Sequence, residues 1–309
     1  MVYFRTNYKH VGYSPPDEVG GLYNAQIGAI HQIASHFTIH EDPAVITMPT
    51  DSGKTAVLMM SPFVLRASRV LVITPSRLVR EQIAEDFRSL ETLRKANVIP
   101  NPVPSPKVFE LKERVDSNSR WEALRQFDVI VATPNVASPA YKDIPPPPTD
   151  LFDLILIDEA HHTPAKTWRE LLLALSHVRT VLFTATPFRR DRGEIPGRFI
   201  YSYPLARAYA DKIFGQITYV PAEVPADVTS DVAIAKRADS MFKEDRAAGF
   251  THYLMVRTDR IARATELASV YAQHTSLKLQ PINNNLSSKR VRKILDDLAA
   301  GHLDAILFT

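Results

Sequence analysis

The chain has 309 residues, of which 45% are hydrophobic and 23% charged, a balance typical of a globular protein long enough for two domains. The absence of cysteine excludes disulfides and thiolate metal sites. A formal net charge of +3 permits a nucleic-acid partner without requiring one, because local patches decide such binding. The first residues lack the apolar core of a signal peptide, so we expect a cytoplasmic protein with no membrane partner.

The first predicted element is an amphipathic helix that opens near Tyr23. Ile27, Ile30 and Ile33 recur at helical spacing, which predicts a helix packed against a core. Gln26 lies in its first turn, and its amide offers the donor and the acceptor that reading an adenine edge requires. From the residues alone, Gln26 is also compatible with an ordinary solvated helix glutamine.

The next predicted element is a short apolar strand that leads into the stretch Met48–Thr55 and a second helix. A strand, a loop and a helix in this order form a phosphate-binding arrangement. Gly53 would let backbone N–H groups approach phosphate oxygens, Lys54 would reach the outer phosphates, and Thr55 would offer its hydroxyl to Mg²⁺. The full Walker pattern has glycine where this chain has Met48, and Gly-Lys-Thr alone also occurs by chance at helix starts.

Two further buried strands are predicted over residues 69–75 and 127–132, and a Thr-Pro pair stands at the end of each. A Thr-Pro turn before a polar helix N-terminus suits contact with a nucleic-acid backbone, although it is equally a plain turn between strand and helix. Two such turns on one sheet edge predict a shared nucleic-acid surface. Its predicted contacts are Thr74, Pro75, Arg77, Thr133, Pro134 and Asn135.

The most apolar predicted strand, residues 151–157, delivers three functional side chains to its carboxyl end, where ligands of open α/β sheets bind. Asp158 can hold Mg²⁺ through the water shell of the ion. Glu159 is placed to polarise an attacking water. His161 would face the junction between an ATP site and a partner domain.

A fifth strand is predicted over residues 180–184 and ends in Thr184-Ala-Thr186-Pro, the third strand to finish in this way. The basic residues that follow are Arg189, Arg190 and Arg192.

The order and spacing of these blocks resemble the motifs of superfamily 2 helicases and translocases of the DEAH type. The stretches 184–191 and 196–201 are similar to the restriction-enzyme-like group, which includes type I and type III restriction subunits. The resemblance implies an α/β fold: a RecA-like parallel sheet flanked by helices, followed by the start of a second RecA-like lobe.

The resemblance also implies roles for the residues. Gln26 matches the adenine-reading glutamine, Thr184 and Thr186 match the coupling motif, and ATP and Mg²⁺ are the implied cofactors. The implied ATP ligands are Gln26, Thr50, Asp51, Ser52, Gly53, Lys54 and Thr55; the implied metal ligands are Thr55 and Asp158; the implied catalytic residues are Lys54, Asp158, Glu159 and His161.

Residues 1–220 are predicted to form the ATP-binding domain, 221–236 a linker, and 237–309 part of a second RecA-like domain. The second part is predicted to contain strands over 252–257, 279–282 and 305–308, and helices over 261–271 and 287–300. The arginines with which the family reaches the γ-phosphate have no counterpart here. We therefore expect the 309-residue chain alone to hydrolyse ATP hardly at all.

The predicted function is an ATP-dependent motor on nucleic acid, with DNA rather than RNA as the expected partner and subunits of a restriction or defence complex as candidate partners. Asp51, in a position that usually holds a small residue, leaves open a nucleic-acid-binding scaffold with a degenerate ATPase site. A nucleoside triphosphatase that acts on no nucleic acid is the third alternative.

Overall fold

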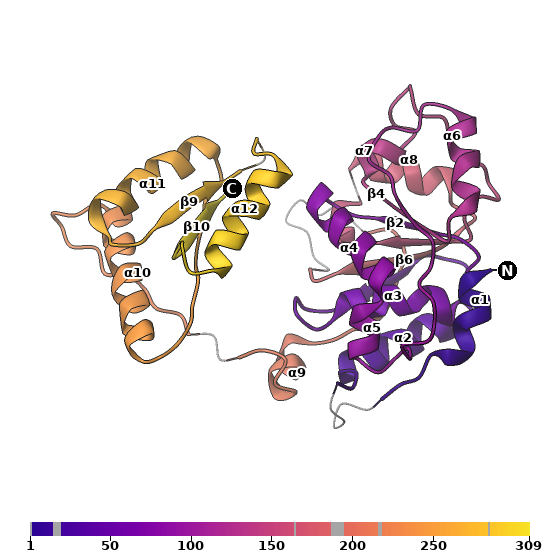
Figure 1. The fold of residues 1–309 in the computed structure, drawn as a ribbon, viewed down its shortest axis with the longest axis horizontal. Helices are drawn as coiled ribbons and strands as arrows, with labels where there is room; N and C mark the ends of the chain where they lie inside the picture. Colours follow the sequence, from indigo (N-terminus) through magenta and orange to yellow (C-terminus); the bar gives the residue numbers. More distant parts are fainter. Residues whose placement is uncertain (1, 15–19, 164, 187–194, 216–217, 284) are drawn as a thin grey trace. The chain divides into compact units, whose positions relative to one another are not determined.

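The computed structural model describes residues 2–14, 20–163, 165–186, 195–215, 218–283 and 285–309. They form two compact units, Met1–Gln216 (unit 1) and Ile217–Thr309 (unit 2), which are drawn in Figure 1. Within the described ranges, no helix is both long and apolar enough to span a membrane.

Unit 1 is built on a sheet of seven strands in the order β3-β4-β2-β5-β6-β1-β7. Every neighbouring pair is parallel. The strands are β1 (Ala44–Thr47), β2 (Val70–Ile73), β3 (Val108–Glu110), β4 (Val129–Ala132), β5 (Leu154–Ile157), β6 (Arg179–Thr184) and β7 (Arg198–Ser202). The parallel order places all carboxyl ends of the strands at one edge of the sheet.

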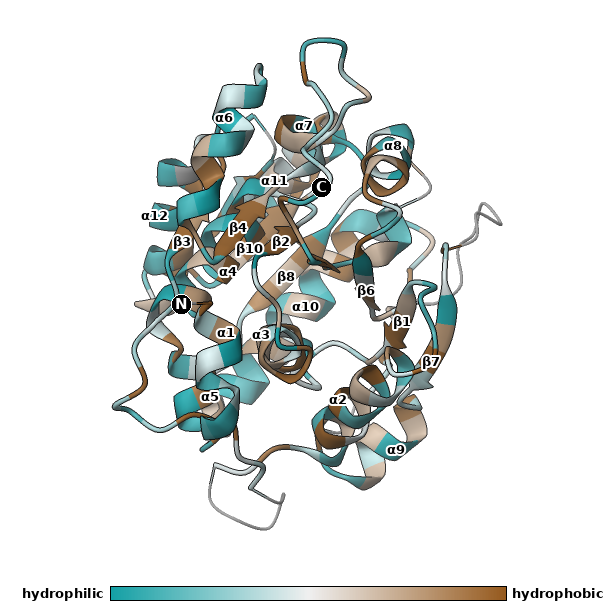
Figure 2. Cartoon of the chain, turned by 90° about the vertical axis from the view of Figure 1, so that its right-hand side faces the viewer, coloured by the Kyte–Doolittle hydropathy of each residue, from teal (hydrophilic) through white to brown (hydrophobic). Residues whose placement is uncertain are grey.

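Both faces of this sheet are buried, as the uninterrupted apolar runs predict. Along β5, Leu154 and Leu156 pack into the core on one face, whereas Ile155 and Ile157 pack into the core on the other. Figure 1 shows α1, α2, α3 and α5 on one side of the sheet and α6, α7 and α8 on the other. The strands are the most hydrophobic part of unit 1, and the outward helix surfaces are hydrophilic (Figure 2).

The helices of unit 1 follow the strands in alternation. They are α1 (Tyr3–Asn7), α2 (Asn24–His36), α3 (Lys54–Val64), α4 (Arg77–Ser89), α5 (Glu91–Lys95), α6 (Asn118–Glu122), α7 (Pro134–Ala137), α8 (Lys166–Ala174) and α9 (Leu205–Ala210), with the short 3₁₀ helices η1 (Tyr8–His10), η2 (Ala123–Gln126) and η3 (Ala160–His162). Helices α4 and α5 are separate, because Leu90 between them adopts a left-handed backbone conformation with φ of +54°.

Unit 2 has three parallel strands in the order β8-β10-β9. Its elements are α10 (Ser230–Ala247), β8 (Leu254–Arg257), α11 (Ile261–His274), β9 (Leu279–Ile282), α12 (Ser288–Ala299) and β10 (Ala305–Phe308). All of the predicted strands and helices of this part are present. Helix α10 was not predicted, and its first turns occupy residues 230–236 of the stretch expected to be a linker. Thr229 caps this helix, and Ala235 and Phe242 pack it into the core of unit 2.

Candidate nucleotide-binding and catalytic site

The phosphate loop joins β1 to α3 and contains two residues with a left-handed backbone. Asp51 has φ of +62° and Gly53 has φ of +80°. A Cβ at position 53 would lie 2.1 Å from Nε2 of Gln26, so only glycine allows this approach. The buried Ser52 hydroxyl donates to the carbonyl of Pro49 at 2.6 Å and tightens the loop.

Met48 stands where the Walker pattern has glycine, and its side chain is fully buried in the core of unit 1. The departure from the pattern therefore adds apolar packing below the loop. Nζ of Lys54 lies 3.4 Å from the carbonyl oxygens of both Met48 and Pro49. These weak bonds hold the ammonium group over the loop, where phosphate oxygens could replace the carbonyls as acceptors. Thr50 is exposed in the same loop, and Thr55 is half-buried at the start of α3.

Gln26 is buried and contacts the phosphate loop directly. Its Oε1 accepts a hydrogen bond from the backbone N–H of Tyr23 at 2.8 Å, and its Nε2 donates to the carbonyl of Gly53 at 3.2 Å. The side chain is only 6% exposed, so it is not a solvated helix glutamine. This amide connects the start of α2 to the loop, while its contact with adenine remains a prediction.

Asp158 and Glu159 follow the carboxyl end of β5, as predicted. The pKa of the Asp158 carboxyl is raised to about 6, chiefly by burial and also by the neighbouring Glu159, while Lys54 opposes the rise. Glu159 has φ of +53°, and this left-handed backbone turns the chain away from the strand immediately after Asp158. The two carboxyl groups and the ammonium group of Lys54 thus form one electrostatic cluster.

His161 connects this acidic pair to the end of β6. Its Nδ1 lies 3.3 Å from Oε2 of Glu159 and 3.4 Å from Oγ1 of Thr184. The Thr184 hydroxyl is fully buried and accepts a hydrogen bond from the backbone N–H of Thr186 at 3.1 Å. The structure therefore brings together two motifs that lie more than twenty residues apart in the sequence.

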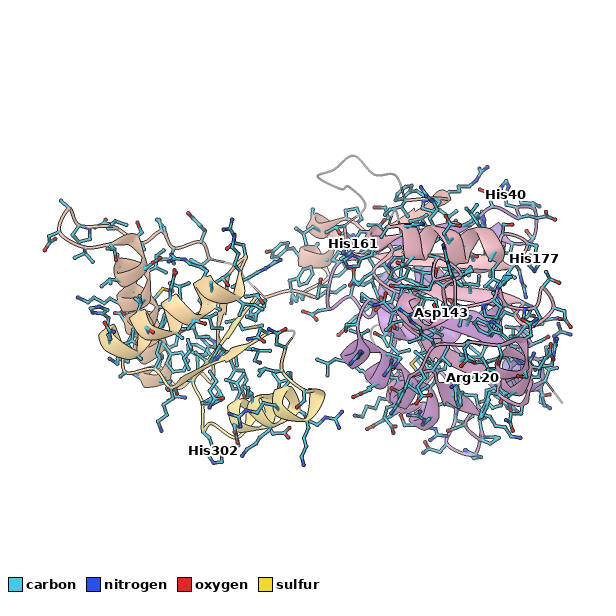
Figure 3. All side chains as sticks on the ribbon, turned by 90° about the horizontal axis from the view of Figure 1, so that it is seen from above. His40, Arg120, Asp143, His161, His177 and His302 are labelled. Atoms are coloured by element: carbon cyan, nitrogen blue, oxygen red, sulfur yellow. The ribbon has the colours of Figure 1, made fainter. Side chains whose placement is uncertain are left out.

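His162 lies beside His161, with ring centroids 4.2 Å apart, whereas two other histidines of unit 1 lie far from this site. His40 precedes β1 and His177 precedes β6, so the parallel sheet places them at the edge opposite to His161. Figure 3 shows this separation.

The residues fit a magnesium ion, although no group of three or more His, Asp or Glu side chains that could hold a metal occurs among the described residues. Magnesium commonly uses one or two protein ligands and takes the rest from water and substrate phosphates. Asp158, whose raised pKa reports a carboxylate poorly compensated by its surroundings, and the Thr55 hydroxyl would serve as those ligands.

The two predicted Thr-Pro turns lie side by side, because β2 and β4 are neighbouring strands. Thr74 and Thr133 are buried, and the Thr74 hydroxyl bonds the carbonyls of Ser76 and Ala132 at 3.2 and 3.3 Å. Thr74 thus shapes the first of the two turns. The exposed groups at this edge are Ser76, Arg77 and Asn135, with Pro75 half-buried and Pro134 buried.

Ser76 was not among the predicted contacts. Its hydroxyl caps α4 by accepting from the N–H of Val79 at 3.3 Å, and a serine directly before a predicted helix is the signal that identifies such a cap. Pro187, Arg189, Arg190 and Arg192, which the sequence singled out, lie outside the described residues.

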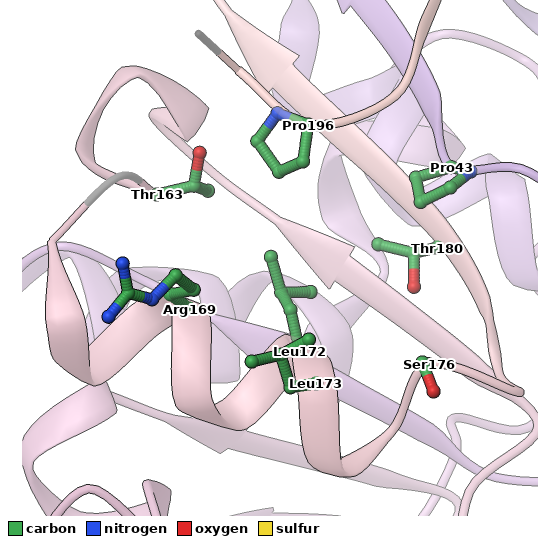
Figure 4. Close-up of a pocket in the computed structure, with 8 residues that line it drawn as sticks. All are labelled: Pro43, Thr163, Arg169, Leu172, Leu173, Ser176, Thr180 and Pro196. Carbon is green, nitrogen blue, oxygen red and sulfur yellow. The ribbon is translucent and has the colours of Figure 1, made fainter. Parts of the chain in front are cut away.

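A cavity of about 410 Å³ lies beside α8, away from the phosphate loop (Figure 4). Its lining residues are Pro43, Thr163, Arg169, Leu172, Leu173, Ser176, Thr180 and Pro196. None of the predicted ATP ligands is among them.

Replacing Asp51 by glycine should strengthen ATP binding modestly, by less than about tenfold. The glycine removes one exposed carboxylate from the loop that would receive the phosphates. The left-handed backbone at this position costs most residues about 1–2 kcal/mol and Asp less, but it is already present without ligand and so changes stability more than affinity. Asp51→Asn is the matched control, since it removes only the charge. Titration with Mg·ATP measures both. A wild type that fails to bind while the glycine variant binds well would contradict this expectation.

The fold and this constellation define a P-loop domain of the RecA-like class. A model of the type III restriction enzyme res subunit family matches residues 20–189, more than half of the 309-residue chain. The chain belongs to this family. Comparison with curated protein sequences gave no match.

Several solved structures share this fold, and one of them is described as a helicase. Lhr from Mycobacterium smegmatis, bound to ssDNA and AMP-PNP, is similar with a TM-score of 0.58 and 16% identity, over 94% of this chain and 40% of Lhr. Mss116p bound to ssRNA and AMP-PNP gives a TM-score of 0.60 and 12% identity, over 93% of this chain and 60% of Mss116p. A variant of S. cerevisiae Dbp5 bound to RNA and ADP BeF3 gives a TM-score of 0.51 and 14% identity, over 95% of this chain and 75% of Dbp5. The chain thus spans less than two thirds of Lhr and of Mss116p.

Proposed function

We propose that the protein is an ATP-dependent motor that couples ATP hydrolysis to movement on nucleic acid. The observation that carries the proposal is the position of His161, within 3.3 Å of Glu159 and 3.4 Å of Thr184. This contact joins the carboxylate placed to activate water with the strand end that precedes the proposed coupling residue Thr186. A signal from bound nucleic acid could reach the hydrolytic carboxylate by this route.

Each residue of the site would have a separate role in ATP binding and hydrolysis. Gln26 would read the adenine edge, while Lys54 and the loop N–H groups would neutralise the phosphate oxygens. Thr55 and Asp158 would hold Mg²⁺, which would supply positive charge to the phosphates of the nucleotide. Glu159 would orient the attacking water and accept its proton.

Nucleic acid would lie across the turns that follow β2 and β4, held through its phosphates. Ser76, Arg77 and Asn135 are exposed there, and α4 presents its N-terminus at the same edge. Backbone N–H groups and a guanidinium group recognise phosphates and not base edges. We therefore propose little sequence preference in this part of the protein.

Binding to nucleic acid should weaken steeply with salt, by about tenfold or more between about 50 and 200 mM, because released counterions drive phosphate contacts. Arg77→Gln should lower affinity equally for unrelated sequences and reduce the salt slope by about 1. Lys95→Gln is the control, because Lys95 is exposed and ends α5, which follows α4 away from this edge. Fluorescence anisotropy at several salt concentrations measures the slope. Strong preference for one short sequence at fixed salt would count against the proposal.

We propose DNA as the substrate and other subunits of a restriction complex as partners. The support is the family, whose description names a restriction enzyme. The solved structures leave the choice of nucleic acid open, because Lhr was bound to ssDNA and Mss116p to ssRNA. Comparing ATPase stimulation by single-stranded DNA, duplex DNA and RNA would decide between them.

A second candidate function, a nucleic-acid-binding scaffold that does not turn over ATP, is favoured by Asp51 and Met48 in the phosphate loop. Nucleic-acid binding without measurable Mg·ATP binding would support this alternative. Equal ATPase rates with and without every nucleic acid would instead indicate a nucleoside triphosphatase that acts elsewhere.

A further inference from the structure

Four side chains meet at the start of the helix that carries Gln26: one from the first residue of α2, and three from the segment between Tyr203, directly after β7, and Asp211, directly after α9. Asn24 is the first residue of α2, and its Nδ2 lies 3.5 Å from Oδ2 of Asp211. The Tyr203 hydroxyl donates to the same oxygen. Nε of Arg207 lies 3.1 Å from Oδ1 of Asp211. We call Asn24, Tyr203, Arg207 and Asp211 the α9 brace.

The α9 brace is fixed to the strand that leads into the phosphate loop. The backbone N–H of Tyr203 donates to the carbonyl of Thr47, the last residue of β1, at 2.9 Å. Tyr203 is only 7% exposed, and its ring stacks near that of Tyr201 with centroids 6.4 Å apart. The phenol therefore has a defined position relative to the loop.

Helix α2 makes a second contact with the β7 to α9 segment one turn later, at Gly28. A Cβ on Gly28 would lie 2.5 Å from the hydroxyl oxygen of Tyr201, so α2 and β7 are in close contact there. Gln26 lies between Asn24 and Gly28 in the sequence, and both of these residues contact the β7 to α9 segment. The turn that presents the Gln26 amide is thus fixed on both sides.

The charges in the brace are complementary. The hydrogen bond from Tyr203 holds the pKa of the Asp211 carboxyl below its usual value, and Arg207 contributes in the same direction. Burial raises the pKa of the Tyr203 phenol, and Asp211 raises it further, so the hydroxyl keeps its proton and remains a donor. A charge-assisted bond of this kind is stronger than a neutral one.

We propose that the α9 brace positions Gln26 and thereby determines the preference of the site for adenine. This inference rests on the proposed function, in which Gln26 reads the base. The Gln26 amide already bonds both Tyr23 N–H and Gly53 carbonyl, so a small shift at the start of α2 would move it away from one of them. Hydrogen bonds to a base edge weaken steeply with such misalignment.

The test compares binding of ADP, GDP and pyrophosphate by isothermal titration calorimetry. Tyr203→Phe removes only the hydroxyl, and Asp211→Asn removes the charge. Each should weaken ADP binding about three- to tenfold, the range for losing one ordinary hydrogen bond, because the lost bond acts on the base only through the position of Gln26. Affinities for GDP and pyrophosphate should stay unchanged, so the ratio of ADP to GDP affinity should fall. Should Asp211→Asn fail to fold, Tyr203→Phe decides the question.

Two further variants sharpen the test. Arg198→Gln breaks the ion pair with Asp42 at the opposite end of β7, 2.9 Å long, and should leave the ADP to GDP ratio unchanged. Asn24→Asp places a carboxylate in the first turn of a helix, which is favourable for an isolated helix. Beside Asp211 it should instead lower the ratio.

An unchanged ADP to GDP ratio in Tyr203→Phe, or an equal loss for ADP, GDP and pyrophosphate, would overturn the inference. Wild type that binds ADP no better than pyrophosphate would overturn adenine reading by Gln26 itself, and the proposed function with it. The two failures are therefore distinguishable.

Discussion

Glu159→Gln should lower ATP turnover in the full-length protein by about 10²–10⁴-fold, the range for losing a general base. Glutamine keeps the size of the side chain and can still bond Nδ1 of His161, which lies 3.3 Å from the present carboxylate. It cannot accept the proton of an attacking water. Affinity for Mg·ATP should remain within severalfold of wild type, because Glu159 contacts neither the phosphate loop nor the base in this account.

Steady-state hydrolysis at saturating nucleic acid, together with equilibrium binding of ATP, measures the two parts separately. Glu113→Gln is the matched control, since Glu113 is exposed and pairs with Arg120 on α6. Equal turnover in Glu159→Gln and wild type would show that another group activates the water.

Asp158→Asn should abolish turnover and yet stabilise the nucleotide-free protein. The pKa of Asp158 is raised from 3.8 to about 6, so the folded state binds its proton more tightly than the unfolded state does. Protonation of Asp158 therefore stabilises the folded state fully below about pH 4, and this stabilisation is lost as the pH rises through 6. At pH 7.5 the charged carboxylate therefore costs about 2–3 kcal/mol, which the neutral amide would recover in part.

The gain in the free energy of unfolding should be about 1–2 kcal/mol at pH 7.5 and should shrink on lowering the pH to 5. Urea denaturation at both pH values measures it. Saturating Mg·ATP should reverse the order of stability, because the metal stabilises only the wild-type carboxylate. A destabilised Asp158→Asn at pH 7.5 without ligand would refute the electrostatic argument.

Asp153, at the other end of β5, provides the control with the opposite sign. Its carboxylate accepts bonds from the backbone N–H groups of Ser68 and Arg69 at 2.8–2.9 Å and lies 3.4 Å from Nη2 of Arg179. Asp153→Asn should therefore destabilise the protein while leaving nucleotide binding unchanged. Strand β5 is thus flanked by a structural aspartate at its amino end and by the proposed metal ligand at its carboxyl end.

The parallel sheet could be predicted because its central strands are continuous apolar runs. Residues 154–157 and 129–132 are buried on both faces, and such runs contain few polar interruptions. The phosphate loop and the acidic pair could be predicted because both follow such strands directly. Spacing along the chain then fixed Lys54, Asp158 and Glu159 at one edge of the sheet.

Strand β7 and helix α9 could not be predicted in this way. β7 is an edge strand whose residues are exposed or half-buried, so it lacks the apolar run that identified the others. Helix α9 has only six residues, and Ala208 alone is buried. Strand β7 pairs with β1, and Asp211, directly after α9, bonds Asn24 of α2; the sequence pattern reveals neither contact.

The orientations of the side chains at the site could not be predicted from the sequence either. Thr74 and Thr133 lie at the predicted edge, but both are buried, and the Thr74 hydroxyl bonds the backbone carbonyls of Ser76 and Ala132. The contact of His161 with Thr184 depends on the left-handed backbone of Glu159, which no residue pattern indicates.

The most direct test of the motor is the ATPase rate of the full-length protein at fixed salt, with and without DNA, for wild type and Lys54→Ala. The account predicts that DNA raises the wild-type rate severalfold and that Lys54→Ala removes both the basal and the stimulated rate. A wild-type rate that is the same with DNA, with RNA and with neither would contradict it.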